Sequence, residues 1–307
     1  MKANREAYGE ALVELGQELD NIVVLDADLA KATYTCKFKD VFPDRFIDCG
    51  IAESNMMGVA AGLSTIGYIP YVSSFAMFAA LRAAEQFRNS VCYPHLNVKV
   101  VATHAGIDCG ADGATHQALE DLSLMRAIPG NHVIVPSDHV STKALVKEIA
   151  KIDGPCYIRV GRDKNEALYQ ESETFEIGKS KELRHGNDAT IIACGSVLKD
   201  ALEAADELAK SGKKVRVIDM YSIKPIDKQA IINAASQTKG IVTVEDHQIT
   251  GGLGSAVTEV TSENNPCKVI RIGMKDCFGR SAPATELYDY FGINSKAIID
   301  AVNKILD

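Results

Sequence analysis

The sequence predicts an α/β protein with two domains, each built on a parallel sheet with flanking helices. Short apolar or β-branched runs alternate with helical patterns along the chain, as in sheets whose parallel strands are joined by helices. The length of 307 residues fits two domains of roughly 150 residues each. Hydrophobic residues make up 46% and charged residues 24% of the chain, which is typical of a compact globular protein.

The first domain is expected to contain six strands. Each is a short apolar or β-branched run, and helical patterns lie between the runs. The expected strands cover residues 22–25, 45–48, 68–72, 98–103, 132–135 and 155–159.

A polar stretch at 163–188 separates the two domains. The alternation of strands and helices stops there, and a new apolar strand begins at residue 189. We therefore expect a first domain over residues 1–168, a linker over 169–187 and a smaller second α/β domain over 188–307. The elements expected in the second domain are strands at 189–194, 215–219, 240–245 and 269–272, and a helix at 199–210.

Composition narrows the location and the partners of the chain. A formal net charge of −8 disfavours nucleic acid or an anionic membrane as a partner, because either would call for a basic surface. The eight cysteines form no CxxC pair, and a chain of this length needs no disulfides. The first turns carry too many charges for a signal peptide, and no apolar run approaches the ~18 residues of a membrane span. We expect a cytoplasmic protein with reduced thiols and no membrane partner.

The segment 103–117, THAGIDCGADGATHQ, concentrates chemically active residue types. It follows an expected strand and holds two histidines, two aspartates and three glycines. Glycines permit close approach of a ligand to the backbone. His104, Asp112 and His116 are suited to bind a polyhydroxylated substrate or to move protons near neutral pH. A long loop that only satisfies its own backbone is the alternative, but the density of these residue types favours a site.

Two helical segments hold further candidates. Glu53 lies near the start of a helix rich in glycine and alanine, where a lone carboxylate is more often a partner of the helix dipole than a catalyst. Small residues later in that helix indicate tight packing against another surface. Phe75 and Phe78 lie three residues apart and would usually be core. However, they follow a strand at the edge where open α/β sheets bind ligands.

Three arginines are candidates for anchoring a phosphate, because guanidinium groups bind phosphate oxygens in pairs. They are Arg5, Arg159 and Arg162. The glycine-rich stretch at 251–256, GGLGSA, is an incomplete dinucleotide motif, and we interpret it as the turn that begins a helix.

Six blocks, taken in order, resemble the signature blocks of the transketolase family. They are IAESNM, SFAMF, ATHAGIDCGADGATHQ, LMRAIPGNHVIVPSD, YIRVGR and VTVEDHQITGGLGSA. The order GxDGxTHQ followed by RxIPxxxVxxPxD is highly specific, and the resemblance spans nearly the whole chain. It implies a pyrimidine-binding thiamine-diphosphate domain followed by the smaller transketolase carboxy-terminal domain.

On the cofactor side, the resemblance implies roles for four residues. Glu53 would hydrogen-bond N1′ of the aminopyrimidine of thiamine diphosphate and act as the catalytic acid. Phe78 would stack on the pyrimidine ring, with Phe75 nearby. Asp28 would lie close to the cofactor and to a dimer interface.

On the substrate side, the resemblance implies contacts to a sugar phosphate. His104 and His116 would contact the ketose hydroxyls and take part in catalysis, and Asp112 would bind the hydroxyl at C2. Arg5 and Arg162 would hold the terminal phosphate.

The sequence departs from the family pattern in three ways. Leu81 stands where a third aromatic residue is usual, and Ala32, beside Thr33, stands where a phosphate-binding serine is expected, so the choice of ketose and aldose stays open. The GDG motif and downstream asparagine, through which the family binds the diphosphate and Mg²⁺, have no match. We therefore expect a GDG-bearing amino-terminal partner subunit and a heterotetramer with sites between protomers. The start at Met1, close to where the pyrimidine-binding domain would begin, is expected to be that of a natural subunit.

The resemblance thus predicts one half of a split transketolase, which moves a two-carbon ketol unit from a ketose phosphate to an aldose phosphate. Three alternatives stay open. A 1-deoxy-xylulose-5-phosphate synthase shares the GADGATH spelling but is normally a single chain, and the Met1 start and THQ argue against it. The β subunit of a 2-oxoacid dehydrogenase is weakened by the DGATHQ loop. A non-catalytic binding subunit is disfavoured by the retention of so many site residues together.

Overall fold

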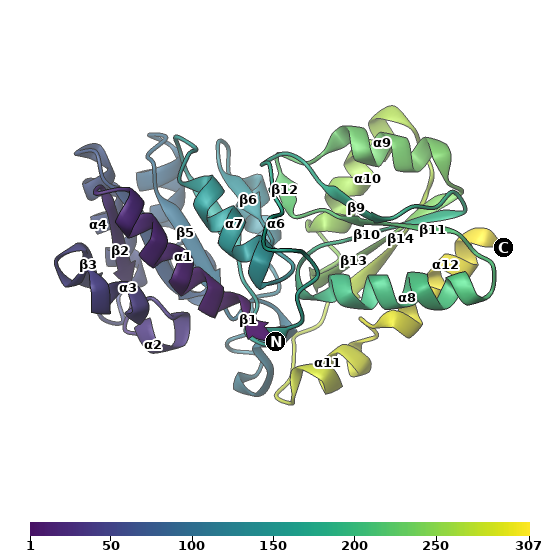
Figure 1. Cartoon of the computed structure of the whole chain (residues 1–307), viewed down its shortest axis with the longest axis horizontal. Helices are drawn as coiled ribbons and strands as arrows, with labels where there is room; N and C mark the ends of the chain where they lie inside the picture. Colours follow the sequence, from purple (N-terminus) through teal and green to yellow (C-terminus); the bar gives the residue numbers. More distant parts are fainter.

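A seven-stranded sheet forms the centre of the first domain (Figure 1). The computed structural model describes residues 1–307. The strand order is β12-β6-β7-β5-β4-β2-β3, parallel except for β12. The strands are β2 (Ile22–Asp26), β3 (Phe46–Asp48), β4 (Ile69–Phe75), β5 (Lys99–Thr103), β6 (His132–Ile134), β7 (Cys156–Arg159) and β12 (Ser222–Lys224).

Helices cover both faces of this sheet, which explains why β2 and β5 are buried along their whole length. α7 has a capping box, because the Asp138 side chain accepts from the Ser141 amide and the Ser141 hydroxyl accepts from the Asp138 amide. The helical segments are α1 (Asn4–Glu18), α2 (Ala30–Thr33), α3 (Cys36–Val41), η1 (Pro43–Arg45), α4 (Glu53–Thr65), η2 (Phe78–Arg82), α5 (Ala84–Gln86), η3 (Phe87–Cys92), η4 (Ile107–Asp112), α6 (Asp121–Ala127) and α7 (His139–Ile149). A two-stranded ribbon, β1 (Lys2–Ala3) with β8 (Lys164–Asn165), joins the two ends of the domain.

The second domain has a five-stranded sheet in the order β14-β13-β10-β11-β9, in which only β9 is antiparallel. Its strands are β9 (Lys181–Arg184), β10 (Ala189–Ala193), β11 (Val215–Asp219), β13 (Gly240–Gln248) and β14 (Lys268–Met274). Its helices are η5 (Gly195–Val197), α8 (Leu198–Lys210), α9 (Lys228–Gln237), α10 (Leu253–Asn264), α11 (Ala284–Phe291) and α12 (Ser295–Leu306).

The predicted fold class is confirmed. Each of the ten predicted strands is present with ends shifted by a few residues, the helix expected at 199–210 is α8, and the glycine-rich turn leads into α10. Four short strands were not expected: β1 and β8, which pair with each other, and β9 and β12. β9 lies inside the segment 169–187, and β12 follows β11 of the second domain but pairs with β6 of the first. Strands of two to four residues are too short to show a period of two.

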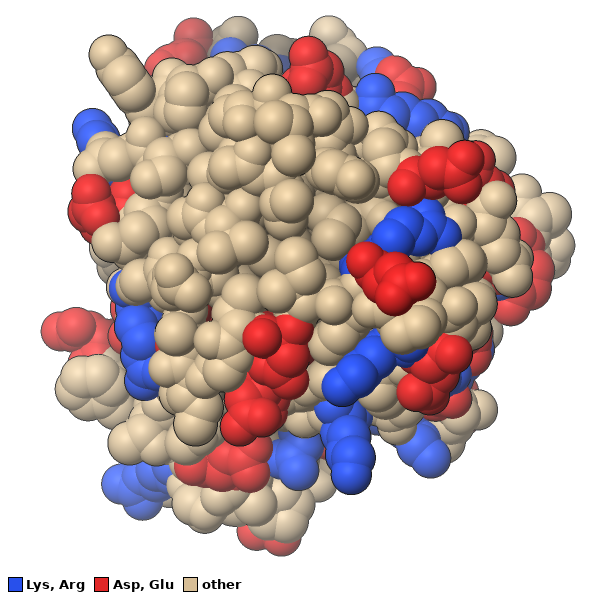
Figure 2. Space-filling model, turned by 90° about the vertical axis from the view of Figure 1, so that its left-hand side faces the viewer, with Lys and Arg blue, Asp and Glu red and all other residues tan.

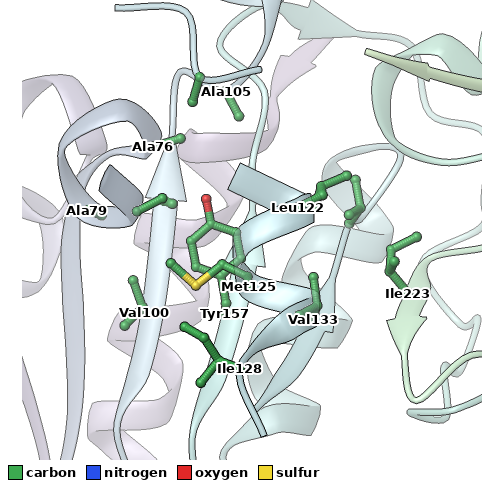
Figure 3. Packing of buried hydrophobic residues seen from close by; sticks show 14 of the residues in the cluster. Ala76, Ala79, Val100, Ala105, Leu122, Met125, Ile128, Val133, Tyr157 and Ile223 are labelled. Atoms are coloured by element: carbon green, nitrogen blue, oxygen red, sulfur yellow. The ribbon is translucent and has the colours of Figure 1, made fainter. Parts of the chain in front are cut away.

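The two domains share one hydrophobic core. β12 completes the sheet of the first domain, and Ile223 of β12 lies in the same buried cluster as Val133 and Tyr157 of that sheet. Figure 3 shows this packing beneath Leu122 and Met125 of α6. The main core cluster therefore contains residues from both domains, and their relative position is set by packing.

None of the helices combines the length and the apolar character required to cross a bilayer. All eight cysteines are free. Figure 2 shows the end of the first domain that lies farthest from the second, where a broad area carries few charged side chains. Several large hydrophobic residues of this domain are exposed, among them Ile51, Ile66, Leu81 and Tyr93.

Shortening Leu122 tests the shared core. Leu122→Ala should lower the free energy of unfolding by about 2–5 kcal/mol, because a fully buried side chain leaves a cavity. Leu19, which is 37% exposed at the end of α1, is the matched control, and Leu19→Ala should change stability by much less. Urea denaturation followed by circular dichroism measures both. Equal effects would contradict the packing.

Candidate active site

Glu53 and Arg82 form a pair at the carboxyl edge of the first sheet. Glu53 is the first residue of α4 and is 1% exposed. Nη1 of Arg82 donates to both carboxylate oxygens, at 2.9 and 3.0 Å. The guanidinium also lies 4.7 Å from the ring centre of Phe78. The planar cation of Arg82 thus packs near the Phe78 ring and also donates hydrogen bonds to the buried carboxylate of Glu53.

An aromatic group adjoins this pair. The register of the sheet brings these aromatic rings together, because Phe75 ends β4 opposite Thr103, which ends β5. The residue after Thr103 is His104, and its ring centre lies 3.8 Å from that of Phe75. Phe75 and Phe78 stack with centres 5.9 Å apart, and the ring of His116 meets the Phe78 ring edge-on at 5.3 Å.

The two histidines are held in the same way. Each ring pairs through Nδ1 with the hydroxyl of the threonine before it, Thr103 with His104 and Thr115 with His116, both at 2.9 Å. Nε2 is therefore the ring atom left for a ligand. His104 has a φ of +57°, which is rare outside glycine and is typical of functional sites.

His104 lies in an environment that disfavours a positive charge. Burial lowers the pKa of His104 to about 3, and the charges of Arg5, Arg162 and His116 act in the same direction. The ring is neutral at physiological pH. It can accept or donate a hydrogen bond but does not act as a cation.

Arg5 and Arg162 form a cationic group beside His104. Nε of Arg5 donates to the carbonyl of Arg162 at 3.1 Å, and Nη1 of Arg5 donates to the carbonyl of Ala32 at 2.7 Å. Nη1 of Arg162 donates to the carbonyl of Cys109 at 2.5 Å and lies 3.7 Å from Asp112. Burial, together with the charge of Arg162, lowers the pKa of Arg5. Because the charge of Arg162 acts on Arg5, the two guanidinium groups are suited to bind one anion together.

Two candidates lie apart from this group. Asp28 is exposed, with a φ of +64°, and its amide donates to Asp48 at 3.2 Å; no contact joins it to the other candidates. Arg159 was expected as a phosphate anchor, and that prediction is wrong. Its side chain is buried, with Nε bound to Asp121 at 2.9 Å and Nη2 bound to two backbone carbonyls. None of these donors faces solvent.

The contacts therefore link eight of the predicted site residues. The linked residues are Arg5, Glu53, Phe75, Phe78, His104, Asp112, His116 and Arg162. Sequence reasoning missed Arg82, which joins Glu53 to this group. The signal available was its place as the one charged residue in SSFAMFAALR.

Comparison with known families identifies the chain's relatives. The family model described as "Transketolase, pyrimidine binding domain" matches residues 1–166, and "Transketolase, C-terminal domain" matches residues 178–298. The chain belongs to the transketolase family. The domain order that the resemblance implied is thereby confirmed.

Two relatives and one solved structure match this chain over nearly its whole length. A putative transketolase C-terminal section from Methanocaldococcus jannaschii is 50% identical over 97% of this chain and 94% of the relative. The 6-deoxy-6-sulfo-D-fructose transketolase subunit SqwH from Clostridium sp. is 41% identical, over 99% and 94%. A solved structure described as "Split gene transketolase, inactive beta4 tetramer" is 51% identical, has a TM-score of 0.94 and covers 100% of this chain. Rat transketolase is 40% identical, and the chain spans about half of its length. The chain is thus a split-transketolase-like subunit.

The neutral state of His104 gives a test by pH. Its ring signals in NMR spectra should stay constant between pH 5 and 8, with assignment by their loss in His104→Gln. Because the folded pKa of about 3 lies below the unfolded value of ~6.5, the unfolded chain takes up the proton first. This group therefore lowers stability as pH falls from ~6.5 to about 3, and His104→Gln should lose less stability over that range. A titration midpoint above pH 5 would contradict the assignment.

Proposed function

We propose that this chain is one half of a thiamine-diphosphate-dependent transketolase. With an amino-terminal partner it would transfer a two-carbon ketol unit from a ketose phosphate to an aldose phosphate in the pentose phosphate pathway. The observation that carries the proposal is the linked group itself. A buried carboxylate and an aromatic face adjoin two histidines and two arginines at one edge of the sheet.

The surroundings of Glu53 fit an aminopyrimidine. Arg82 already lies there with two properties that the ring would share once protonated at N1′, a planar face near Phe78 and an N–H directed at the carboxylate. Arg82 would move aside for the cofactor. Thiamine diphosphate, when bound, supplies the nucleophilic carbon that receives the two-carbon unit. Glu53 would hold a proton at N1′ of the pyrimidine, and Phe75 would support the Phe78 ring.

The remaining residues suit a sugar phosphate. Nε2 of His104 and of His116 would bind the substrate hydroxyls and move protons at them, and Asp112 would accept from the hydroxyl at C2. Arg5 and Arg162 would bind the terminal anion by charge-assisted hydrogen bonds. Asp28, outside the linked group, would lie nearer the cofactor's other end and the subunit interface.

The partner would supply the diphosphate and Mg²⁺ side of the site. The sequence lacks the GDG motif, and the broad area with few charges in Figure 2 suits contact with another protein. The relative described as an inactive β4 tetramer also supports the need for a second kind of subunit. We propose a cytoplasmic heterotetramer, consistent with eight free thiols.

A sulfonated sugar is a second candidate substrate. The relative SqwH is described as a subunit of a 6-deoxy-6-sulfo-D-fructose transketolase. Sulfonate, like phosphate, presents oxygens that the Arg5 and Arg162 pair would bind. Activity with each donor distinguishes the two substrates.

A coupled assay tests the proposal. It measures two-carbon transfer with thiamine diphosphate and Mg²⁺, first with this chain alone and then with a GDG-bearing partner. We expect activity only in the mixture. Activity of the chain alone would refute the half-site arrangement, and inactivity in both would refute the transketolase function for the donors used.

Replacing Glu53 tests the catalytic acid. Glu53→Gln should reduce kcat at least 100-fold, because the amide cannot take up a proton, while co-purification of the subunits is unchanged. Glu207, exposed on α8, gives the matched control, and Glu207→Gln should keep full activity. Turnover of Glu53→Gln near that of the parent enzyme would refute the assignment.

Replacing Arg162 tests the anion site. Arg162→Gln should raise KM for a ketose phosphate by about 10–100-fold, in line with the loss of a charge-assisted hydrogen bond. KM for a ketol donor without phosphate should change little. Arg184→Gln, on exposed β9, is the control. An equal rise for both donors would show that Arg162 does not recognise the phosphate.

A further inference from the structure

The second domain binds the loop that carries the substrate residues. We call residues 103–117 the substrate loop. The side chain of Asp246, on β13, accepts from the Ile107 amide at 2.9 Å and from the Asp108 amide at 3.1 Å. These amides lie at the start of η4, where backbone N–H groups have no partner inside the helix. Asp246 is 4% exposed, and Tyr288 donates to it at 3.0 Å.

Asp108 extends this connection to Arg162. Its carboxylate accepts from the Arg162 amide at 2.6 Å and from the Asp163 amide at 3.3 Å. The Arg162 side chain then returns to the loop at the carbonyl of Cys109. A single series of hydrogen bonds therefore runs from the second domain through η4 to the arginine that faces Asp112.

Two glycines show how closely the carboxylates fit. A Cβ on Gly106, whose φ is +75°, would lie 2.1 Å from Oδ2 of Asp246. A Cβ on Gly161 would lie 2.3 Å from Oδ2 of Asp108. Each carboxylate occupies the space that a side chain on the facing glycine would need. The close fit therefore requires glycine at both positions.

The far end of the loop is also held by the second domain. Gln117 donates to the carbonyl of Arg280 at 2.8 Å and to that of Gly110 at 3.1 Å. Ser281 donates to the carbonyl of Ala111 at 2.5 Å. The backbone of η4, which ends at Asp112, is therefore fixed from both sides by residues outside the first domain.

We propose that Asp246 is a positioning residue for the substrate. By holding the amides of η4 it would fix Asp112 and Arg162 relative to each other, so the second domain would set the affinity for the sugar phosphate. The identity of that substrate rests on the proposed function, whereas the positioning of the loop does not.

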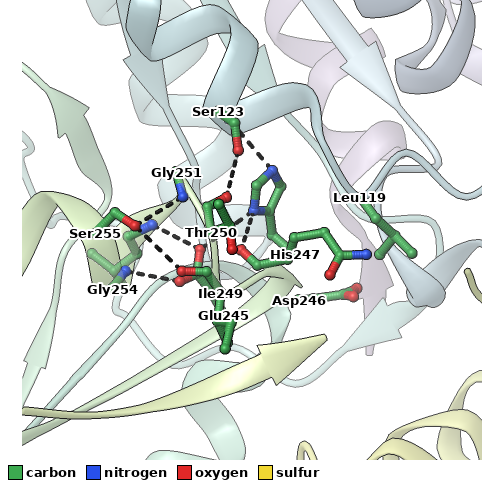
Figure 4. A network of polar contacts seen from close by, with 12 residues as sticks. Leu119, Ser123, Glu245, Asp246, His247, Ile249, Thr250, Gly251, Gly254 and Ser255 are labelled. Carbon is green, nitrogen blue, oxygen red and sulfur yellow. Dashed lines mark hydrogen bonds and ion pairs between the residues drawn. The ribbon is translucent and has the colours of Figure 1, made fainter. Parts of the chain in front are cut away.

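The neighbouring residue provides a matched control. Glu245 is also a buried acid on β13 and also accepts from two backbone amides, those of Leu253 and Gly254, at 2.7 and 2.8 Å. These amides begin α10, away from the substrate loop. Figure 4 shows the two side chains directed to opposite sides of the strand. Glu245→Gln therefore perturbs the same strand without touching the loop.

Hydrogen exchange tests the positioning on the chain by itself. Asp246→Asn should speed amide exchange at Ile107 and Asp108 at least tenfold. The two amides bond different carboxylate oxygens, and in asparagine one of these is replaced by an NH2 group that cannot accept. Glu245→Gln should speed exchange only at the start of α10. Unchanged exchange at 107–108 in Asp246→Asn, or equal acceleration there in both variants, would overturn the proposal.

Kinetics of the reconstituted enzyme test the consequence for substrate. Asp246→Asn should raise KM for the ketose phosphate at least tenfold, with kcat within about threefold and half-saturation by thiamine diphosphate unchanged. Tyr288→Phe, which removes one bond to Asp246, should shift KM in the same direction by less. A fall in kcat alone, as expected when fewer molecules are folded, would overturn the proposal. An inactive parent mixture would refute the proposed function, and the exchange experiment would still decide the role of Asp246.

Discussion

Parallel pairing of β4, β5 and β7 is the constraint on which the site depends. The register places Phe75 opposite Thr103 and Ala102 opposite Arg159, so the residues that follow all three strands emerge at one edge. Phe75 and His104 meet there, and Arg162 follows three residues after β7. A slip of one residue would turn each side chain to the opposite face of the sheet. The strand register thus fixes the positions of the loops that carry the site residues.

The buried pair of Arg159 and Asp121 connects the same strands to the second domain. Nη2 of Arg159 donates to the carbonyls of Ala118 and of Asp246. Ala118 directly follows the substrate loop and Asp246 lies on β13, so this nitrogen connects the loop to the second domain. Removal of one member of such a pair leaves an uncompensated charge and commonly costs 3–5 kcal/mol, by the order of magnitude known for buried pairs. Together with β12, this pair makes the second domain part of the site's framework.

Local patterns were sufficient to predict ten of the fourteen strands and most of the linked group. β-branched runs identified the ten strands, and the density of histidine, aspartate and glycine identified the loop with His104 and His116. Pairings between distant residues could not be predicted. Arg159 resembled any other arginine because its partner, Asp121, lies 38 positions away. Arg82 and Asp246 were missed for the same reason, since their importance arises only from the folded neighbourhood.

The threonine beside each histidine has a consequence for how the rings handle protons. A hydroxyl both donates and accepts, and it changes role by rotation about one bond. Thr103 and Thr115 therefore accommodate either tautomer of His104 and His116. When a ring takes up a proton at one nitrogen and releases one from the other, to water or to a bound hydroxyl, its threonine can follow by rotation alone. For the almost fully buried ring of His104, one tautomer would present Nε2 as an acceptor and the other as a donor, and Thr103 is compatible with both.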